Sequence, residues 1–460
     1  MNLKKRIILS LILLSYFITA IDGSIVITGL TKIAEDLRLT HTELSWVQNA
    51  YVLAFGGFML MGGSLGDTFG RKRMFNLSLI LFGIGSLGAG IAQTTPIMIV
   101  SRFFQGFGAA ILAPTSLALI MDYFEGKERV KAVAWYGSIS GLGLCIGLIA
   151  GGAITSYLSW RDGFLINIPI IAVMLLLSFK YLDNKKITIF RFDSLGTILS
   201  VTGIFCIIYA IDGAINIITW FIIGTILLII FVRNESQNPT PIMPLHLFYD
   251  RNRCSAYIAR ALLIAALMGY NFFISEFMQI RFHYTPLWAG CAFFPMTITT
   301  FIGAIKVPKL VERYGDKKVL TLGFLLLIIG FCRLLLLDNC SSYLWGIAIP
   351  MIFIGFGQGF AMSPLTNLGI SNVNSSDAGA ASGLVNVAHQ IGGAFGLSIM
   401  VAASNGLDNT LARFHIGMLV ALTCIVLALC SIIIKTKCKF SYIIYLINKE
   451  RNHINNVSSG

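Results

Sequence analysis

Apolar runs of about 20 residues recur along the whole chain, separated by short polar segments. A helix needs about 20 predominantly apolar residues to cross a bilayer, and only helices and closed barrels satisfy their backbone polar groups there. Charged residues make up only 12% of the chain, against about 25% in soluble proteins. We therefore expect an all-α membrane protein with many spans.

The runs between polar breaks predict fourteen membrane-spanning helices. They are expected at residues 7–30, 44–66, 74–93, 98–122, 131–155, 162–182, 194–212, 217–233, 255–280, 287–307, 319–337, 343–366, 378–404 and 413–435. Only the segment DGAIN at 212–216 separates the seventh and eighth runs. These two could instead form a hairpin that enters the membrane without crossing it.

The basic residues predict the orientation, because Lys and Arg accumulate in cytoplasmic loops. With the N-terminus inside, 26 of the 34 Lys and Arg residues fall in cytoplasmic segments and five in outside loops. We expect a multi-pass protein of the cell (plasma) membrane with both termini in the cytoplasm. The net charge of +13 lies in these short clusters and forms no continuous stripe, which argues against a nucleic acid partner.

An internal repeat predicts the domain organisation. The segment GSLGDTFGRKRM at 63–74 is matched by PKLVERYGDKKVL at 308–320, and such duplication is typical of two-lobed transporters. We expect an N-terminal six-helix lobe at 1–190, two inserted helices at 191–235, a C-terminal six-helix lobe at 236–440 and a cytoplasmic tail at 441–460. Since two lobes enclose a complete site, the protein is expected to be a monomer.

Few charges lie inside the spans, where each costs at least ~2.5–3.5 kcal/mol on insertion scales. Asp22 and Glu276 fall one in each lobe, and Arg102 lies early in the fourth span. A buried carboxylate responds to wetting and to nearby charge, as proton coupling requires. The alternative is a structural salt bridge, for Glu276 for instance with Arg260. Two further carboxylates lie at span ends and are expected to be solvated: Asp122 and Asp212.

The first repeat loop combines turn residues with opposite charges. Gly66 and Gly70 predict a tight turn, and Asp67 places a carboxylate beside the basic cluster that begins at Arg71. Such charges can form a latch that breaks and re-forms as helices move. The alternative is an ordinary positive loop that only sets the orientation.

Several motifs resemble those of the major facilitator superfamily. GSLGDTFGRKRM resembles its loop motif, RFFQGFGAA at 102–110 its fourth-helix motif, and GLCIGLIAGG at 143–152 its antiporter glycine motif, although Leu148 stands where that motif has Pro. Four further segments are similar to fourteen-span drug/proton antiporters: IDGSIV at 21–26, WVQNAY at 46–51, WRDGFLINIP at 160–169 and GAASGLVN at 379–386. The resemblance runs from about residue 15 to 435.

The resemblance implies a major facilitator fold of two six-helix lobes plus two central helices, and transport by alternating access. It associates Asp22 and Arg102 with protonation and its coupling to substrate release. It associates Asp67, Gly70 and Arg71 with the gate. Three glycines recur on one face of the fifth span, where they allow close helix packing that would seal the cavity against proton leak: Gly143, Gly147 and Gly151.

The substrate site is expected to use residues of both lobes. Phe273 and Phe277 could form an aromatic pocket around Glu276, although such a stripe in a chain with 33 Phe is also typical of packed or lipid-facing residues. Histidine side chains ordinarily titrate near neutral pH, so His389 could join proton traffic or be structural. The expected substrate-binding residues are Asp22, Glu276, Tyr51, Asn271, Phe273, Phe277, Asn386 and His389.

We expect a proton-coupled multidrug efflux antiporter that exports lipophilic, cationic compounds. Its partners would be small-molecule drugs, protons and the lipid bilayer. Export of an endogenous metabolite or fatty acid, nutrient uptake, and coupling to sodium through carboxylates and Asn271 are the alternatives. The chain has no P-loop or HExxH motif and no polar segment long enough to be a soluble catalytic domain, so it is not expected to be an enzyme or a metal protein or to need a cofactor.

Overall fold

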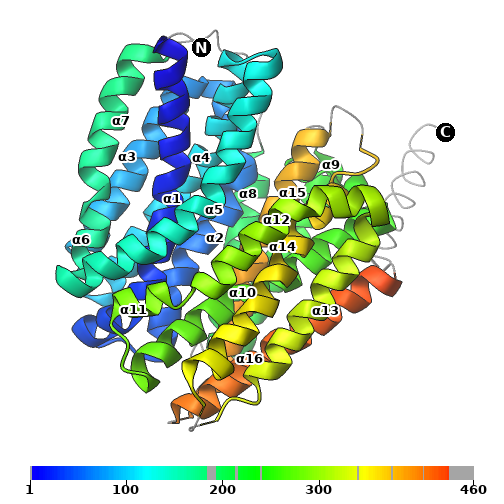
Figure 1. Ribbon diagram of the computed structural model, residues 1–460. Helices are drawn as coiled ribbons and strands as arrows, with labels where there is room; N and C mark the ends of the chain where they lie inside the picture. Colours follow the sequence, from blue (N-terminus) through cyan, green and yellow to red (C-terminus); the bar gives the residue numbers. More distant parts are fainter. Residues whose placement is uncertain are drawn as a thin grey trace.

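A computed structural model describes residues 3–183, 193–212, 216–238, 241–338, 341–373, 377–407 and 409–434. These residues form helices throughout (Figure 1). Their bounds are α1 Leu3–Leu37, α2 His41–Phe69, α3 Arg71–Gly90, α4 Thr95–Tyr123, α5 Gly126–Tyr157, α6 Trp160–Leu165, α7 Asn167–Tyr181, α8 Ser194–Ile211, α9 Ile217–Gln237, η1 Leu245–Phe248, α10 Arg251–Arg281, α11 Pro286–Cys291, α12 Phe294–Tyr314, α13 Asp316–Leu334, η2 Leu344–Ala348, α14 Ile349–Gly369, α15 Ala378–Ser404 and α16 Thr410–Ile434.

Every expected span lies on a helix, but the predicted count of fourteen membrane crossings is not confirmed. Within the described ranges, twelve helices are long and apolar enough to cross a bilayer, counting α6 with α7, α11 with α12 and η2 with α14 as one each. The two others are α5, whose described apolar stretch is Ile146–Tyr157, and α13, which carries charged residues at both ends. Both helices of the expected inserted pair, α8 and α9, meet the criterion.

The helices form two groups joined by a helical hairpin. Helices α1 to α7, here called the first half, pack on one another, and helices α10 to α16, the second half, do the same. Figure 1 shows the blue and cyan helices of the first half on the left and the yellow to red helices of the second half on the right. The hairpin of α8 and α9 contacts both halves, through α2 and α15.

The two repeat loops have matching backbones, which supports the internal duplication. Gly70 ends α2 and begins α3 with φ +94°, and Gly315 ends α12 and begins α13 with φ +81°. Residues with a side chain rarely adopt such angles, so glycine is needed at both corners. The prediction that Gly66 belongs to the turn was wrong. Gly66 is buried inside α2, where it lies close to Thr115 of α4.

The halves meet at the end of the bundle away from the N-terminus. Late in α1, Ile27 O accepts a hydrogen bond of 2.6 Å from Ser275 Oγ of α10. One turn further, Thr31 Oγ1 donates to Gln279 Oε1 at 2.5 Å. Helix α11 packs against α5 near the same end (Figure 1). These contacts close the space between the halves on that side.

Large apolar side chains cover the outer surface of the bundle. They lie on helices of both halves and of the hairpin, and include Ile84, Leu176, Phe179, Ile218, Ile229, Ile305 and Leu427. Exposed apolar surface of this extent requires contact with lipid rather than water. The chain is therefore a multi-pass membrane protein.

Candidate functional site

A fully buried ion pair lies inside the first half. Arg102 Nη1 of α4 contacts Asp22 Oδ2 of α1 at 2.5 Å, and both residues have 0% exposure. Gln105 Nε2 donates to the other carboxylate oxygen, Asp22 Oδ1, at 2.7 Å. Because both oxygens of Asp22 are occupied and an opposite charge is in contact, the desolvation of the carboxylate is compensated.

Local sequence explains how Arg102 reaches this position. A Cβ on Gly106 would lie 2.2 Å from Tyr51 O, so glycine lets α4 approach the backbone of α2. Arg102 Nε then donates to Val47 O at 3.0 Å, and its guanidinium lies 4.5 Å from the centre of the Tyr51 ring. Tyr51, predicted from sequence as a substrate-binding residue, thus makes a cation–π contact with Arg102.

Glu276 has different partners and lies away from this network. It sits five residues from the end of α10, where its Oε1 is 3.5 Å from His41 Nδ1 of α2 and 3.9 Å from Arg413 Nη1 of α16. Arg260, the partner considered from sequence, instead donates to Met362 O at 3.1 Å. The structure thus places Glu276 in a contact between the halves and does not join it to Asp22.

The predicted aromatic residues of α10 are packed inside the second half. Phe277 stacks obliquely on Phe414 with ring centres 4.8 Å apart, and Phe273 touches Gly417 of the same helix, α16. Both have 2% exposure. In this arrangement they are core residues, as the alternative interpretation held. Asn271 is less buried, and its Oδ1 accepts no hydrogen bond from any described residue.

A second group of polar residues lies on α1, α10 and α15, where α1 and α15 pack on α10. Arg260 of α10 acts electrostatically on His389 of α15, and Tyr16 of α1 acts on Arg260. Asn386 lies one turn before His389, and its amide donates to Ser382 O of its own helix at 3.1 Å. Of the predicted substrate-binding residues, Asn386 and His389 are thus partly exposed on α15, near a cation of α10.

The first repeat loop forms the expected charge latch. Arg71 Nη2 lies 2.9 Å from Asp67 Oδ1, while Arg71 Nη1 lies 2.7 Å from Asp122 Oδ1 and donates to Ala118 O of α4. The expectation that Asp122 is simply solvated was wrong, since its carboxylate is paired. The latch ties the corner at Gly70 to the end of α4.

The three predicted glycines of α5 pack against α1. A Cβ on Gly143 would lie 2.8 Å from Ala20 Cβ, on Gly147 2.7 Å from Ser24 Oγ, and on Gly151 2.9 Å from Ile25 Cα. Each approach is closer than two side chains allow, so these positions need glycine. The seam runs along the stretch of α1 that contains Asp22.

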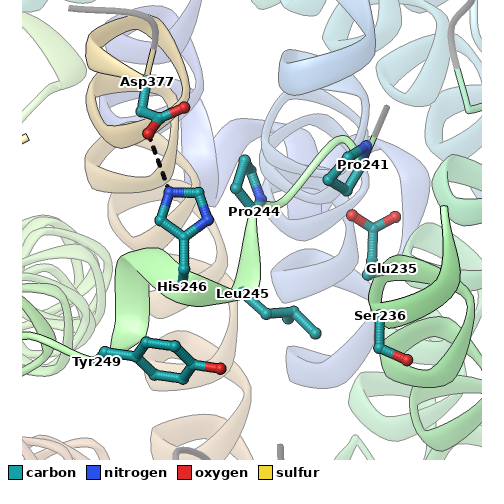
Figure 2. A pocket seen from close by; sticks show the side chains of 8 residues that line it. All are labelled: Glu235, Ser236, Pro241, Pro244, Leu245, His246, Tyr249 and Asp377. Atoms are coloured by element: carbon teal, nitrogen blue, oxygen red, sulfur yellow. Dashed lines mark hydrogen bonds and ion pairs between the residues drawn. The ribbon is translucent and has the colours of Figure 1, made fainter. Parts of the chain in front are cut away.

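One cavity lies at the base of the hairpin. It has a volume of about 390 Å³ and is lined by residues of α9, of η1 and of the segment before α15. Figure 2 shows Glu235 of α9 on one side and His246 on the other, with His246 Nε2 3.0 Å from Asp377 Oδ2. None of these residues was predicted as functional from sequence.

Sequence reasoning also missed the neutral and interhelical partners of the predicted charges. Gln105 lies inside the quoted motif RFFQGFGAA, and its place one turn after Arg102 was the available signal. His41 and Arg413 fall in expected outside segments and carry no local signal. Their contact with Glu276 depends on the packing of three helices.

The comparisons with known proteins agree on one family. The profile of the Major Facilitator Superfamily matches residues 12–397. The chain is 33% identical over 410 residues to a puromycin resistance protein of Streptomyces alboniger, covering 86% of this chain and 81% of that protein. It is 31% identical over 403 residues to a cephamycin export protein of Amycolatopsis lactamdurans, covering 85% and 83%. A solved POT-family peptide transporter, 12% identical, has the same fold with a TM-score of 0.70, covering 94% of this chain and 96% of its own.

Proposed function

This chain belongs to the Major Facilitator Superfamily and is a transport protein rather than an enzyme, and we propose that it exports antibiotics and other lipophilic, cationic compounds in exchange for protons. Two relatives that are 31–33% identical over most of their length carry names of antibiotic resistance or export. This relationship is the observation that carries the proposed drug efflux.

Proton coupling is assigned to Asp22 with Arg102 as its partner. Protonation of Asp22 would remove the charge that holds Arg102 Nη1 at 2.5 Å. Arg102 would keep its bond to Val47 O and its contact with Tyr51, so its guanidinium would stay in position while its charge loses its partner. A proton and a cationic substrate would then be bound alternately, because each neutralises the same carboxylate.

Alternating access would be achieved by moving the two halves against each other. We place both termini in the cytoplasm on the basic-residue distribution. The contacts Ile27–Ser275 and Thr31–Gln279 would then close the external side, and this arrangement would be open toward the cytoplasm. Substrate release outside would require these contacts, and the link from His41 to Glu276, to break.

Gating is assigned to the latch and to the glycine seam. The ties of Arg71 to Asp67 and Asp122 connect three helices at the proposed cytoplasmic end, where they would be remade as the halves move. The packing of Gly143, Gly147 and Gly151 on α1 would exclude water from the neighbourhood of Asp22. This exclusion would limit proton leak.

The substrate is proposed to bind between the halves, in a monomer of the cell membrane. Asn386 and His389, which are partly exposed, are the proposed contacts in this arrangement, whereas Asp22 and Tyr51 are buried and would contact substrate only after the helices around them move. Phe273, Phe277 and Glu276 would come into contact with substrate only if α10 moves relative to α16, because these side chains are now enclosed there. Asn271 has a free buried oxygen among the described residues and is proposed as a hydrogen-bond acceptor for the substrate.

The test uses inside-out vesicles with an imposed proton gradient. Puromycin, lincomycin and ethidium would each be added to vesicles containing wild type, Asp22→Asn or Glu35→Gln. Glu35 is an exposed carboxylate on the same helix, paired only with Lys32, so it controls for loss of a surface charge. Equal amounts of folded protein would be verified by size-exclusion chromatography.

We expect substrate to collapse the gradient with wild type and Glu35→Gln and not with Asp22→Asn. Collapse that persists in Asp22→Asn would overturn the assignment of coupling to Asp22. Substrate-driven collapse that requires sodium, or a response only to fatty acids or other endogenous anions, would replace the proposed ion or substrate.

A further inference from the structure

The tip of the hairpin carries a buried carboxyl group that the proposed mechanism does not use. Asp212 follows the last residue of α8 and has 8% exposure. Neither of its oxygens accepts a hydrogen bond from a residue that the structure describes. The expectation of a solvated carboxylate at this span end was therefore wrong. An ionised carboxylate in such a place is strongly disfavoured.

The surroundings of Asp212 join three parts of the molecule. The hairpin helix α8 packs on α2 of the first half and on α15 of the second half. Asn49 of α2 donates to Ser398 Oγ of α15 at 2.8 Å, a hydrogen bond between the halves in which both residues have 0% exposure. These two side chains face the carboxyl group of Asp212. The carboxyl group thus lies beside the seam between α2 and α15.

The seam lacks a donor that a protonated carboxyl group can supply. Asn49 Oδ1 is buried and accepts no hydrogen bond from any residue in the described ranges. An ionised carboxylate has only acceptors, whereas a protonated one has an O–H to donate. Protonation of Asp212 would therefore remove an uncompensated charge and add the missing donor at the same place.

The groups that act on Asp212 carry no charge. Burial raises the pKa of Asp212 to about 7, against smaller lowering effects from Ser398 and Asn49. The helices packed around Asp212 carry other titratable side chains: His41, Glu43, Tyr51 and Asp67 on α2, Cys206 and Tyr209 on α8, Arg233 and Glu235 on α9, and His389 on α15. Each of them has a partner elsewhere, lies at the far end of the hairpin, or has no effect on the carboxyl group of Asp212.

The hairpin is held at its base while its tip touches the seam. At the base, Asp193 accepts hydrogen bonds from Gly196 N at 2.8 Å and Asn234 Nδ2 at 2.5 Å, and Glu235 accepts one from Met243 N at 2.7 Å. Closer to the tip, Trp46 of α2 contacts Phe205 and Tyr209 of α8. The base contacts join the two hairpin helices and the following segment to one another, and the contacts of Trp46 attach the hairpin to α2, so we expect Asp212 to stay beside Asn49 when the halves separate.

We propose that Asp212 is a proton-binding site of the inserted hairpin, and that its protonation favours closure of the seam between α2 and α15. When the seam closes, Asp212 takes one proton from the aqueous phase at that end and becomes a neutral acid. When the seam opens and water enters, the same proton returns and the carboxylate is solvated. This site rests on the proposed alternating access but not on Asp22 as the coupling residue.

The consequence is a direction for the pH dependence. Because the closed seam raises the pKa of Asp212, acid at this end favours closure and alkali favours opening. If this end is external, an acidic exterior would return the transporter to its inward-open state. The two inserted helices would then respond to external pH.

The experiment measures the width of the seam in the full-length protein. Spin labels at Thr42→Cys and Asn405→Cys, near the ends of α2 and α15, would report the distance in lipid nanodiscs between pH 5 and pH 9, with other labelled cysteines replaced by serine. We expect the distance in wild type to change from short to long as the pH rises, with a single midpoint. Glu35→Gln, which removes an exposed carboxylate at the same end, should keep this midpoint.

Asp212→Asn keeps the shape of the neutral acid and should stay closed over the whole range, while Asp212→Glu should keep a transition with a shifted midpoint. A transition in Asp212→Asn with the wild-type midpoint would overturn the proposal. Should the asparagine variant not fold, infrared spectra of the wild type decide the question. They should contain the band of a protonated carboxyl group at pH 6 that is lost at pH 9, and its absence would equally overturn the proposal.

The two proposals can fail separately. Asp22→Asn should abolish gradient collapse and leave the seam titration unchanged. A seam that titrates normally in a protein that transports none of the compounds would retain Asp212 as a proton site and reject drug/proton exchange. A seam that does not respond to pH, in a protein that exchanges these compounds for protons, would reject Asp212 as a proton site and retain drug/proton exchange.

Discussion

The two predicted coupling carboxylates both lie on membrane-spanning helices but differ in their surroundings. Asp22 is enclosed within the first half, where Arg102 and Gln105 occupy both of its oxygens at 2.5 and 2.7 Å. Glu276 belongs to the second half, and its contact with His41 comes from the first half at 3.5 Å. Movement of the halves therefore leaves the partners of Asp22 in place and separates Glu276 from one of its own.

This difference suits the two carboxylates to different functions. A charge whose partners move with it keeps its environment until a proton or substrate arrives, which suits a coupling site. A charge whose partner lies on the other half contributes to the energy difference between closed and open arrangements, which suits a gate. The following changes test this distinction in order of their expected effect on stability.

The largest effect is expected for Arg102→Ala. Removing the guanidinium leaves the buried carboxylate of Asp22 uncompensated, which should lower the stability by about 3–5 kcal/mol and abolish transport. Thermal unfolding of the purified protein in detergent measures the loss of stability, and the vesicle assay measures the loss of transport. The double variant Asp22→Asn/Arg102→Ala should recover much of the stability and none of the transport. Equal losses in the single and double variants would contradict a central ion pair.

Close packing of helices should be the next most sensitive feature, in both halves. A Cβ on Gly396 of α15 would lie 2.3 Å from Ala265 Cα, and one on Gly147 of α5 would lie 3.0 Å from Ile21 Cα. We expect Gly396→Ala to cost more than Gly147→Ala, each in the range of about 1–3 kcal/mol. Gly23→Ala is the matched control in α1, since no atom lies within 4 Å of its Cβ. If Gly147→Ala unfolds at the same temperature as Gly23→Ala, the packing of α5 on α1 does not depend on glycine at position 147.

Glu276→Gln should have a smaller effect. The effect of altering each partner of Glu276 should depend on which half carries that partner. Its ion pairs are longer than that of Asp22, so we expect a loss of about 1 kcal/mol or less. His41→Gln, on the other half, should favour the opened arrangement to a similar degree, and the two changes together should add little. Arg413→Gln, on the same half as Glu276, should not shift that equilibrium. Distances between spin labels on the two halves measure the equilibrium between the closed and opened arrangements. Fully additive effects of Glu276→Gln and His41→Gln would contradict a direct contact between these two side chains.

The smallest effect on stability is expected in the repeat loops. Arg71→Gln breaks the ties to Asp67 and Asp122, which are partly exposed and should contribute about 0.2–1 kcal/mol each. Its turnover number should nevertheless fall several-fold, because the latch joins three helices. Asp316→Asn is the counterpart in the second half, where Asp316 only accepts a bond of 3.2 Å from Asn367, and it should transport normally. Unchanged turnover in Arg71→Gln would assign the loop to orientation alone.

The positions of the helices could be predicted from sequence because the signal is local. A run of about 20 apolar residues specifies a span by itself, and every expected run lies on a helix. The internal repeat could also be recognised in the sequence. Gly70 and Gly315 both have positive φ angles at the equivalent corners. The resemblance associated Asp22 and Arg102 with the same step, but their direct contact and the part of Gln105 in it were not predicted.

The partners of the other charges were decided by tertiary structure alone. Glu276 was considered with Arg260 on its own helix, but the packing of α2 and α16 brings His41 and Arg413 to it. Asp212 was interpreted as solvated because it ends a span, yet α2 and α15 cover it. Burial at a helix end depends on residues distant in sequence, and so does the choice of ion partner. Sequence therefore determined the family and the positions of the helices, whereas the packing of the two halves and the hairpin decided which charges pair and which carboxyl groups are removed from water.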